Sequence, residues 1–253
     1  MDVRDVMMMS RAGKRMPGVL YAPETGSRGF AIALHGLGGW QRQSVVVAMA
    51  RAACDMGYTT LTFDASDGAA APDADFATST TSGYLADLED VVAYARAEGL
   101  CTDSFMLLGH SLGGMIASMY AAAHPREVSH LVLVAPAVSW KVYTKWFLPY
   151  GIWWFITDVH QTRGPEGAVF PLRRSWLLDF LKHDIRTTSE EVTVPVLVVL
   201  GERDNVVGTA RALEACAYGY PQGRFALVPG ATHTFRGSED ALADTITAWH
   251  TSL

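Results

Sequence analysis

The chain is poor in the features that mark disulfide-framed or metal-stabilised proteins. Only three of its 253 residues are cysteines, and Cys54, Cys101 and Cys216 show neither a CxxC pair nor a Cys/His ligand spacing. Three unpaired cysteines predict reduced thiols rather than a disulfide framework or a zinc site. We therefore expect no bound metal and no other cofactor.

Long runs of one residue type are also missing. The net charge of −6 comes from mixed acidic and basic residues, which argues against a nucleic-acid partner. The most apolar stretch, WFLPYGIWWFI at residues 146–156, is about half as long as a bilayer crossing requires. The N-terminal stretch MDVRDVMMMSRAGKR lacks the apolar centre of a signal peptide. We expect a cytoplasmic protein without a membrane span, and the sequence leaves open whether it is a monomer or a homodimer.

What the chain does contain is a regular alternation of apolar strands and helices. A hairpin is predicted over residues 5–23, and the strands expected after it are GFAIALHG, YTTLTFD, SFMLLGH, SHLVLVAP, VPVLVVLGERD and GRFALVPG. Strands of nearly continuous aliphatic residues separated by helices predict a mostly parallel, doubly wound α/β sheet covered on both faces. The active site of such a sheet lies at the carboxyl ends of its strands. The length is typical of a single domain.

The alternation breaks over residues 137–191. This stretch is rich in aromatic residues and has helix-like spacing only in pieces. In the clearest piece, RRSWLLDFLKHD, Trp176 and Phe180 continue an apolar stripe that starts at Leu172, the residue just before it, at intervals of four. We interpret residues 137–191 as a cap inserted above the strand ends.

The aromatic residues of this insertion are candidates for substrate contact. Pro149 and Gly151 are expected to split the insertion into short helices that shift to admit a substrate. Trp140, Trp153 and Trp154 are the candidate substrate-binding residues, for an apolar acyl or aromatic group. The alternative is that these rings only pack the core of the insertion.

One serine lies in a setting that neither a plain helix nor a plain strand requires. In LLGHSLGGMIA, Gly109 and Gly113 stand two residues either side of Ser111, although an interior glycine costs about 1 kcal/mol relative to alanine. A tight turn from strand to helix needs small residues at those positions, which is the G-x-S-x-G pattern of a nucleophile elbow. The apolar strand before and the helix after predict that Ser111 is a nucleophile. The alternative is a glycine-rich turn without chemistry.

A serine hydroxyl is a weak nucleophile that needs a base held in place by a third group. Asp204 follows a buried strand in LVVLGERDNVV, and His233 follows the next strand in LVPGATHTF. Both side chains are expected at the sheet edge where Ser111 emerges. We therefore predict a Ser111, Asp204 and His233 triad, with Glu202 as a competing acid.

A second glycine-rich loop, ALHGLGGW, follows another apolar strand. It is expected to lie close to the elbow and to form an oxyanion hole from the backbone N–H groups of Leu37 and Leu112. A phosphate-binding loop is excluded because the lysine and Ser/Thr of a P-loop are missing. His35 and His110 flank these loops and are expected to make structural hydrogen bonds.

Taken together, these motifs resemble the α/β-hydrolase superfamily over nearly the whole chain. HGLGG, GHSLGG, GERDNVV and GATHTF, with the hairpin and the insertion, are similar to the serine esterase branch that includes feruloyl and cinnamoyl esterases and monoacylglycerol lipase-like enzymes. The resemblance implies Ser111, Asp204 and His233 as the triad and Leu37 and Leu112 as oxyanion donors. The chain departs from these relatives after its FD strand end, where FDASDGAAAPDADF replaces their usual GxGxS loop.

The leading interpretation is a carboxylic ester hydrolase that acts on a small-molecule ester or thioester through an acyl-enzyme on Ser111. An alcohol, amine or thiol can intercept the same acyl-enzyme, so an acyltransferase or thioesterase is the alternative enzyme. A non-catalytic ligand-binding module with a hydrolase fold is the third hypothesis. A haloalkane dehalogenase or epoxide hydrolase is disfavoured because either would carry aspartate at the elbow.

Overall fold

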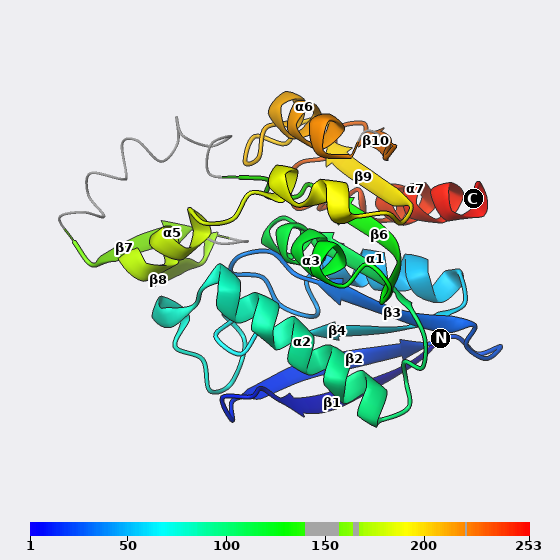
Figure 1. Ribbon diagram of the computed structural model, residues 1–253, viewed down its shortest axis with the longest axis horizontal. Helices are drawn as coiled ribbons and strands as arrows, with labels where there is room; N and C mark the ends of the chain where they lie inside the picture. The colour runs from blue at the N-terminus through cyan, green and yellow to red at the C-terminus, as the bar shows by residue number, and fades with distance from the viewer. Residues whose placement is uncertain (140–156, 164–166, 221) are drawn as a thin grey trace.

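The computed structural model describes residues 1–139, 157–163, 167–220 and 222–253 (Figure 1). Its strands are β1 (Asp2–Met9), β2 (Arg15–Ala22), β3 (Gly29–Leu34), β4 (Tyr58–Phe63), β5 (Phe105–His110), β6 (Val128–Val134), β7 (Val159–Arg163), β8 (Val169–Arg173), β9 (Val196–Gly201) and β10 (Arg224–Val228). Its α-helices are α1 (Ser44–Asp55), α2 (Thr81–Ala97), α3 (Leu112–Ala123), α5 (Arg174–Phe180), α6 (Thr209–Gly219) and α7 (Glu239–Thr251). Short 3₁₀ turns are η1 (Phe76–Thr78), η4 (Ile185–Thr187) and η5 (Ser189–Glu191).

Eight strands form the central sheet, in the order β1-β2-β4-β3-β5-β6-β9-β10. The β1–β2 hairpin is antiparallel and joins the sheet through an antiparallel β2–β4 pair, whereas every pair from β4 to β10 is parallel. The predicted N-terminal hairpin and mostly parallel α/β sheet are therefore confirmed. Parallel strands place all their carboxyl ends at one edge, which is where the loops after β3, β4, β5, β9 and β10 gather.

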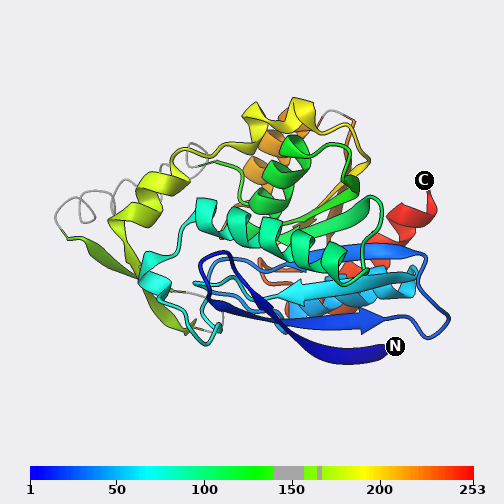
Figure 2. The same cartoon turned by 60° about the horizontal axis from the view of Figure 1, so that its bottom comes forward.

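Helices cover both faces of this sheet. α1 and α7 pack against each other on one face, and α2, α3 and α6 lie on the other (Figures 1 and 2). α2 begins at Thr81 because the Thr80 hydroxyl caps the helix by accepting the N–H of Gly83 at 2.9 Å. Satisfying this otherwise unpaired N–H group fixes where the helix starts.

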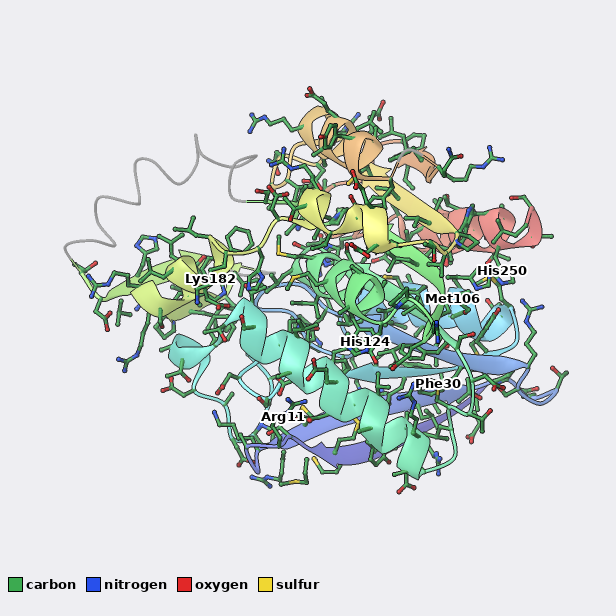
Figure 3. All side chains as sticks on the ribbon, in the orientation of Figure 1. Arg11, Phe30, Met106, His124, Lys182 and His250 are labelled. Carbon is green, nitrogen blue, oxygen red and sulfur yellow. The ribbon has the colours of Figure 1, made fainter. Side chains whose placement is uncertain are left out.

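The core lies between these helix layers and the sheet. Phe30 and Met106, on neighbouring strands, are 3% and 0% exposed, as expected for strands covered on both faces (Figure 3). All three cysteines are buried free thiols. No helix among the described residues is long and apolar enough to cross a membrane.

The segment between β6 and β9 departs from the prediction of short helices. Its described part contains an antiparallel hairpin, β7–β8, before α5. Leu172 belongs to β8 rather than to the helix, although it is buried together with Trp176 and Phe180. The helix starts only at Arg174 because the strand pairing extends to Arg173, opposite Val159.

Two contacts join this segment to the loop and helix that follow β4. Phe170 of β8 packs against Phe76 of η1 with ring centroids 4.7 Å apart. Asp179 of α5 accepts the backbone N–H and the hydroxyl of Ser82, both at 2.8 Å. Since Ser82 lies in the first turn of α2, the carboxylate satisfies a helix N–H group and is favoured by the helix dipole.

Candidate active site

Ser111 lies in the sharp turn from β5 to α3. Its φ of 53° and ψ of −115° are uncommon for a residue with a side chain, and such strain concentrates at functional sites. The turn is tight because the backbones touch. A Cβ atom on Gly109 would lie 2.2 Å from the carbonyl oxygen of Gly113, and one on Gly113 would lie 2.5 Å from that of His35. The two glycines are therefore required by the close approach of strand, helix and loop.

A hydrogen-bonded chain of three side chains starts at Ser111. The hydroxyl of Ser111 donates to Nε2 of His233 at 3.0 Å, and Nδ1–H of His233 donates to Oδ2 of Asp204 at 2.8 Å. Asp204 also accepts the backbone N–H groups of Val206 and Val207 through Oδ1, at 2.8 and 3.1 Å. The loops after β5, β9 and β10 thus bring the three predicted residues together with a nucleophile–base–acid geometry.

The surroundings of Asp204 favour its ionised form beside the imidazole of His233. The side chain of Asp204 is fully buried, whereas that of His233 is 12% exposed. Burial alone would raise the pKa of Asp204, but the hydrogen bonds from His233, Val206 and Val207 outweigh it and hold the pKa below its usual value. A carboxylate in this position fixes the tautomer of His233 that leaves Nε2 free to accept the serine proton.

Glu202, the competing acid, lies elsewhere. Its Oε2 accepts the backbone N–H of Gly230 at 2.8 Å, in the turn after β10. The hydrogen-bonded partner of His233 is Asp204.

The glycine-rich loop after β3 lies directly against the elbow. A Cβ atom on Gly36 would be 3.0 Å from Cβ of Ser111. Leu112 is the first residue of α3, where N–H groups lack a partner within the helix. No hydrogen bond within the described part of the chain uses the backbone N–H of Leu37 or of Leu112. The two groups therefore remain available at this position.

His35 and His110 have the structural hydrogen bonds expected of them. Nδ1–H of His35 donates to the carbonyl of Gly36 at 2.7 Å, and Nε2–H of His110 donates to the carbonyl of His233 at 2.9 Å. Burial lowers the pKa of His35 to about 4. Burial and the neighbouring His233 lower that of His110 to about 3. Both rings are neutral at physiological pH.

A pocket of about 430 Å³ of empty space, partly open to solvent, adjoins the glycine-rich loop. Its lining includes Leu37 and Leu112 and the aromatic rings of Phe76, Tyr84 and Trp176. Its polar lining comes from His35, from the loop after β4 and from the first two turns of α2. The sequence did not single out Phe76, and it presented Trp176 only as part of a helical stripe. No short motif identifies a pocket wall assembled from distant segments.

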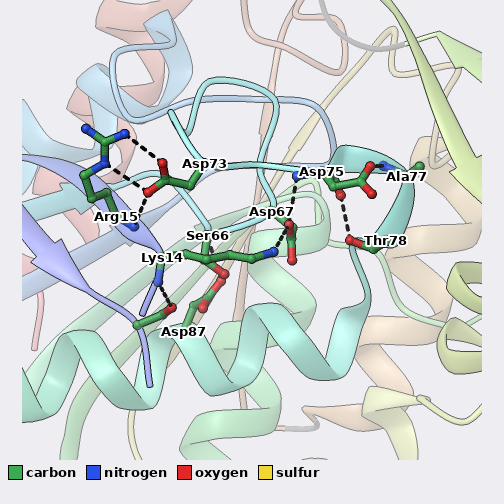
Figure 4. Close-up of polar contacts among 10 residues, drawn as sticks. Lys14, Arg15, Ser66, Asp67, Asp73, Asp75, Ala77, Thr78 and Asp87 are labelled. Atoms are coloured by element: carbon green, nitrogen blue, oxygen red, sulfur yellow. Dashed lines mark hydrogen bonds and ion pairs between the residues drawn. The ribbon is translucent and has the colours of Figure 1, made fainter. Parts of the chain in front are cut away.

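The loop after β4 is tied to its surroundings (Figure 4). Nζ of Lys14, in the turn of the N-terminal hairpin, lies 2.6 Å from Oδ1 of Asp67. The backbone N–H of Ser66 donates to Oδ2 of Asp87 at 2.8 Å. Asp67, Ser66 and Asp87 all line the pocket, so these contacts shape its polar end.

None of the three predicted substrate-binding residues is among the residues that the structure describes. Trp140, Trp153 and Trp154, together with Pro149 and Gly151, lie outside the described residues. Within the described ranges, no group of three or more His, Cys, Asp or Glu side chains is arranged to hold a metal ion.

The fold matches solved structures along its whole length. The ferulic acid complex of Est1E from Butyrivibrio proteoclasticus has a TM-score of 0.80 and 19% identity, with 98% of each chain covered. Curated relatives match only locally. A 1-acylglycerol-3-phosphate O-acyltransferase of Arabidopsis thaliana is 48% identical over 44 residues, which cover 17% of this chain and 10% of that enzyme. The monoacylglycerol lipase abhd6-A of Xenopus laevis is 43% identical over 44 residues, which cover 17% of this chain and 13% of that enzyme.

The structural match confirms the α/β-hydrolase fold, whereas the local matches span only about a tenth of the curated relatives' length. The family model described as "Serine aminopeptidase, S33" matches residues 26–184, more than half of the chain and including the elbow. The protein therefore belongs to the serine aminopeptidase S33 family of α/β hydrolases.

Proposed function

We propose that this chain cleaves carboxylic esters through an acyl-enzyme on Ser111. The observation that carries the proposal is the unbroken hydrogen-bond path from the Ser111 hydroxyl through His233 to the buried carboxylate of Asp204. The Ser111 oxygen and Nε2 of His233 lie within the distance that proton transfer requires. The esterase-like fold and the family are consistent with this reaction.

The proposed reaction proceeds in two halves. The Ser111 oxygen attacks the ester carbonyl while Nε2 of His233 takes the hydroxyl proton, and the carbonyl oxygen becomes an oxyanion held by the N–H groups of Leu37 and Leu112. The bond to the leaving oxygen breaks as His233 returns the proton to it. Water then repeats the sequence on the acyl-enzyme and releases the acid.

The pocket and the base lie on opposite sides of Ser111. Most of the pocket lining comes from the loops after β3 and β4 and from α2, whereas Asp204 and His233 follow β9 and β10, and β5 lies between these groups of strands in the sheet. The leaving oxygen must face His233 to receive its proton, so the acyl group extends the other way. We therefore assign the pocket to the acyl group.

The lining supports an apolar or aromatic acyl group. Phe76 and Trp176 contribute ring surfaces that favour such groups, and ferulic acid, the ligand in the Est1E complex, is an aromatic acid. We propose that residues 137–191 act as a cap which helps to select this group. This role agrees with the contacts of Phe170 and Asp179 with the segment that follows β4.

Two ester series test this assignment. In one, the acyl group is lengthened from acetyl to octanoyl and arylpropanoyl on a constant alcohol, and in the other the alcohol is varied on a constant acetyl group. Phe76→Ala should change the ranking in the first series and leave the second nearly unchanged. Ser111→Ala serves as the inactive control, and a fluorophosphonate probe should label the wild type but not this variant. Ester turnover by Ser111→Ala at the wild-type rate would refute the proposal.

Acyl transfer is the alternative, favoured by the local match to an acyltransferase. Adding glycerol or a lysophospholipid to the assay and analysing the products separates the two reactions. A transferase yields mainly the new ester, whereas a hydrolase yields mainly the free acid.

A further inference from the structure

The glycine-rich loop that contains Leu37 is hydrogen-bonded to a buried aspartate, Asp64, at its C-terminal end. Asp64 follows β4 and is 1% exposed. Its Oδ1 accepts the backbone N–H of Gln41 at 2.7 Å. When the Gln41 side-chain amide is oriented to satisfy both groups, its nitrogen donates to the same carboxylate at 2.6 and 2.7 Å. A single carboxylate thus holds both the main chain and the side chain of Gln41.

A second contact holds the N-terminal end of the same loop, at His35. The backbone N–H of Ala65, the residue after Asp64, donates to Nε2 of His35 at 3.2 Å. The end of β4 therefore contacts the loop on both sides of Leu37. Between these contacts the loop turns tightly, since the N–H of Gly39 donates to the carbonyl of Gly36 at 3.0 Å.

The carboxylate is retained in an environment that disfavours its charge. Burial raises the pKa of Asp64 to about 6, although the Gln41 N–H acts in the opposite direction. At neutral pH the group is therefore mainly ionised, and hydrogen bonds to an ionised acceptor are roughly twice as strong as neutral ones. The proposed reaction gives Asp64 no proton to transfer, so its contacts must account for its presence.

We propose that Asp64 is a positioning residue that holds the oxyanion loop through Gln41, so that the N–H of Leu37 points at the developing oxyanion. This inference rests on the proposed function, because it concerns the oxyanion hole of that reaction. Asp64 acts through the loop and has no contact role with the substrate. Loss of one oxyanion donor lowers kcat by about 10²–10³, and a displaced donor should cost less, about 10–100-fold.

Four variants test the contact itself. Asp64→Ala removes the acceptor, Gln41→Ala removes the side-chain donor at a partly exposed position, Asp64→Ala/Gln41→Ala removes both, and Asp64→Asn keeps a carbonyl acceptor for the Gln41 N–H. The matched control is Asp73→Ala, in the same loop, which removes the exposed ion pair with Arg15 and the hydrogen bond from the Arg15 backbone N–H (Figure 4). Thermal melting verifies that each variant is folded.

The readouts are kcat and KM on an acetyl ester, and the affinity for a trifluoromethyl ketone, whose adduct with Ser111 places an oxyanion in the hole. Asp64→Ala and Gln41→Ala should lower kcat with KM nearly unchanged, and ketone affinity should fall by the same factor as kcat. The double variant should be no worse than Asp64→Ala alone, because both residues act through one contact. Asp64→Asn should retain most of the activity, and Asp73→Ala all of it.

Three results would overturn the inference: wild-type kcat in folded Asp64→Ala, a loss of kcat without loss of ketone affinity, or single-variant losses that multiply in the double variant. If Asp64→Ala does not fold, Gln41→Ala decides, since wild-type kcat and ketone affinity there also contradict the inference. Failure of the proposed function has a different signature. In that case the wild type itself would leave esters and the fluorophosphonate probe unreacted.

Discussion

Adding one methyl group at Gly109 should damage both the stability of the elbow and its chemistry. The alanine Cβ would lie 2.2 Å from the carbonyl oxygen of Gly113 and 2.7 Å from the backbone nitrogen of Gly114, where ordinary contacts begin near 3.4 Å. Because the opposing atoms are backbone, the first turn of α3 must move by about 1 Å. Overpacking of this kind costs about 1–3 kcal/mol or more, which lowers Tm by about 2–4 °C per kcal/mol in a chain of this size.

Catalysis should suffer more than stability. A displacement of about 1 Å at a reacting group costs about 100-fold in rate. Gly114→Ala is the matched substitution in the first turn of α3, where the nearest atoms are Cβ of Pro136 at 2.9 Å and the carbonyl oxygen of Gly109 at 3.0 Å, and where alanine also favours the helix. Calorimetry and kcat on an acetyl ester should rank Gly109→Ala well below Gly114→Ala. If Gly109→Ala kept Tm within 1 °C and kcat within twofold of the wild type, the explanation of the glycine spacing would be wrong.

The other predictions concern the Ser111–His233–Asp204 triad, the pocket and the pH dependence of stability. Ser111→Ala and His233→Ala should each lower kcat by about 10⁴–10⁶, and Asp204→Asn by about 10⁴ because the imidazole then adopts the wrong tautomer; stopped-flow assays on an activated ester measure all three. Phe76→Ala should lower kcat/KM for arylpropanoyl esters about 10–100-fold relative to acetyl esters, since the lost ring surface contacts only the longer group; equal losses on both substrates would contradict the pocket assignment. Burial raises the pKa of Asp87 from 3.8 to about 6 in the folded chain, so the stability contributed by its neutral form is lost as the pH rises through that range. Asp87→Asn should therefore raise Tm relative to the wild type at pH 8 and change it little at pH 4, and a fall at pH 8 would contradict this assignment.

The fold was predictable because its strands are continuous aliphatic runs at regular intervals, and this pattern has few alternatives. The elbow was equally visible, since Gly109 and Gly113 have a spacing that only a tight strand-to-helix turn requires. Asp204 and His233 could be placed near Ser111 because parallel strands end at one edge. Their hydrogen bonds agree with that placement, and the catalytic roles remain predictions.

Contacts between distant segments were not predictable in the same way. The β7–β8 hairpin escaped notice because its strands are short and β8 contains Pro171, a residue that usually argues against a strand. The contact between Asp64 and Gln41 joins two loops. Asp64 belongs to the FD strand end, but no spacing in the sequence relates it to Gln41. Trp176 faces the pocket because of how α5 packs, which the stripe of apolar residues alone does not specify.

The pocket and His233 lie on opposite sides of Ser111, and this arrangement sets the order of events in the proposed reaction. In this scheme the alcohol leaves on the side of His233, and the attacking water must approach on the same side because it needs the same base. The acyl group meanwhile stays in the pocket lined by Phe76 and Trp176. The product is the free acid if water reaches the acyl-enzyme first, and a new acyl compound if another nucleophile does. In the proposed reaction, the acid is therefore selected by the pocket and its acceptor on the side of His233, so substitutions in the two regions should change the two preferences independently.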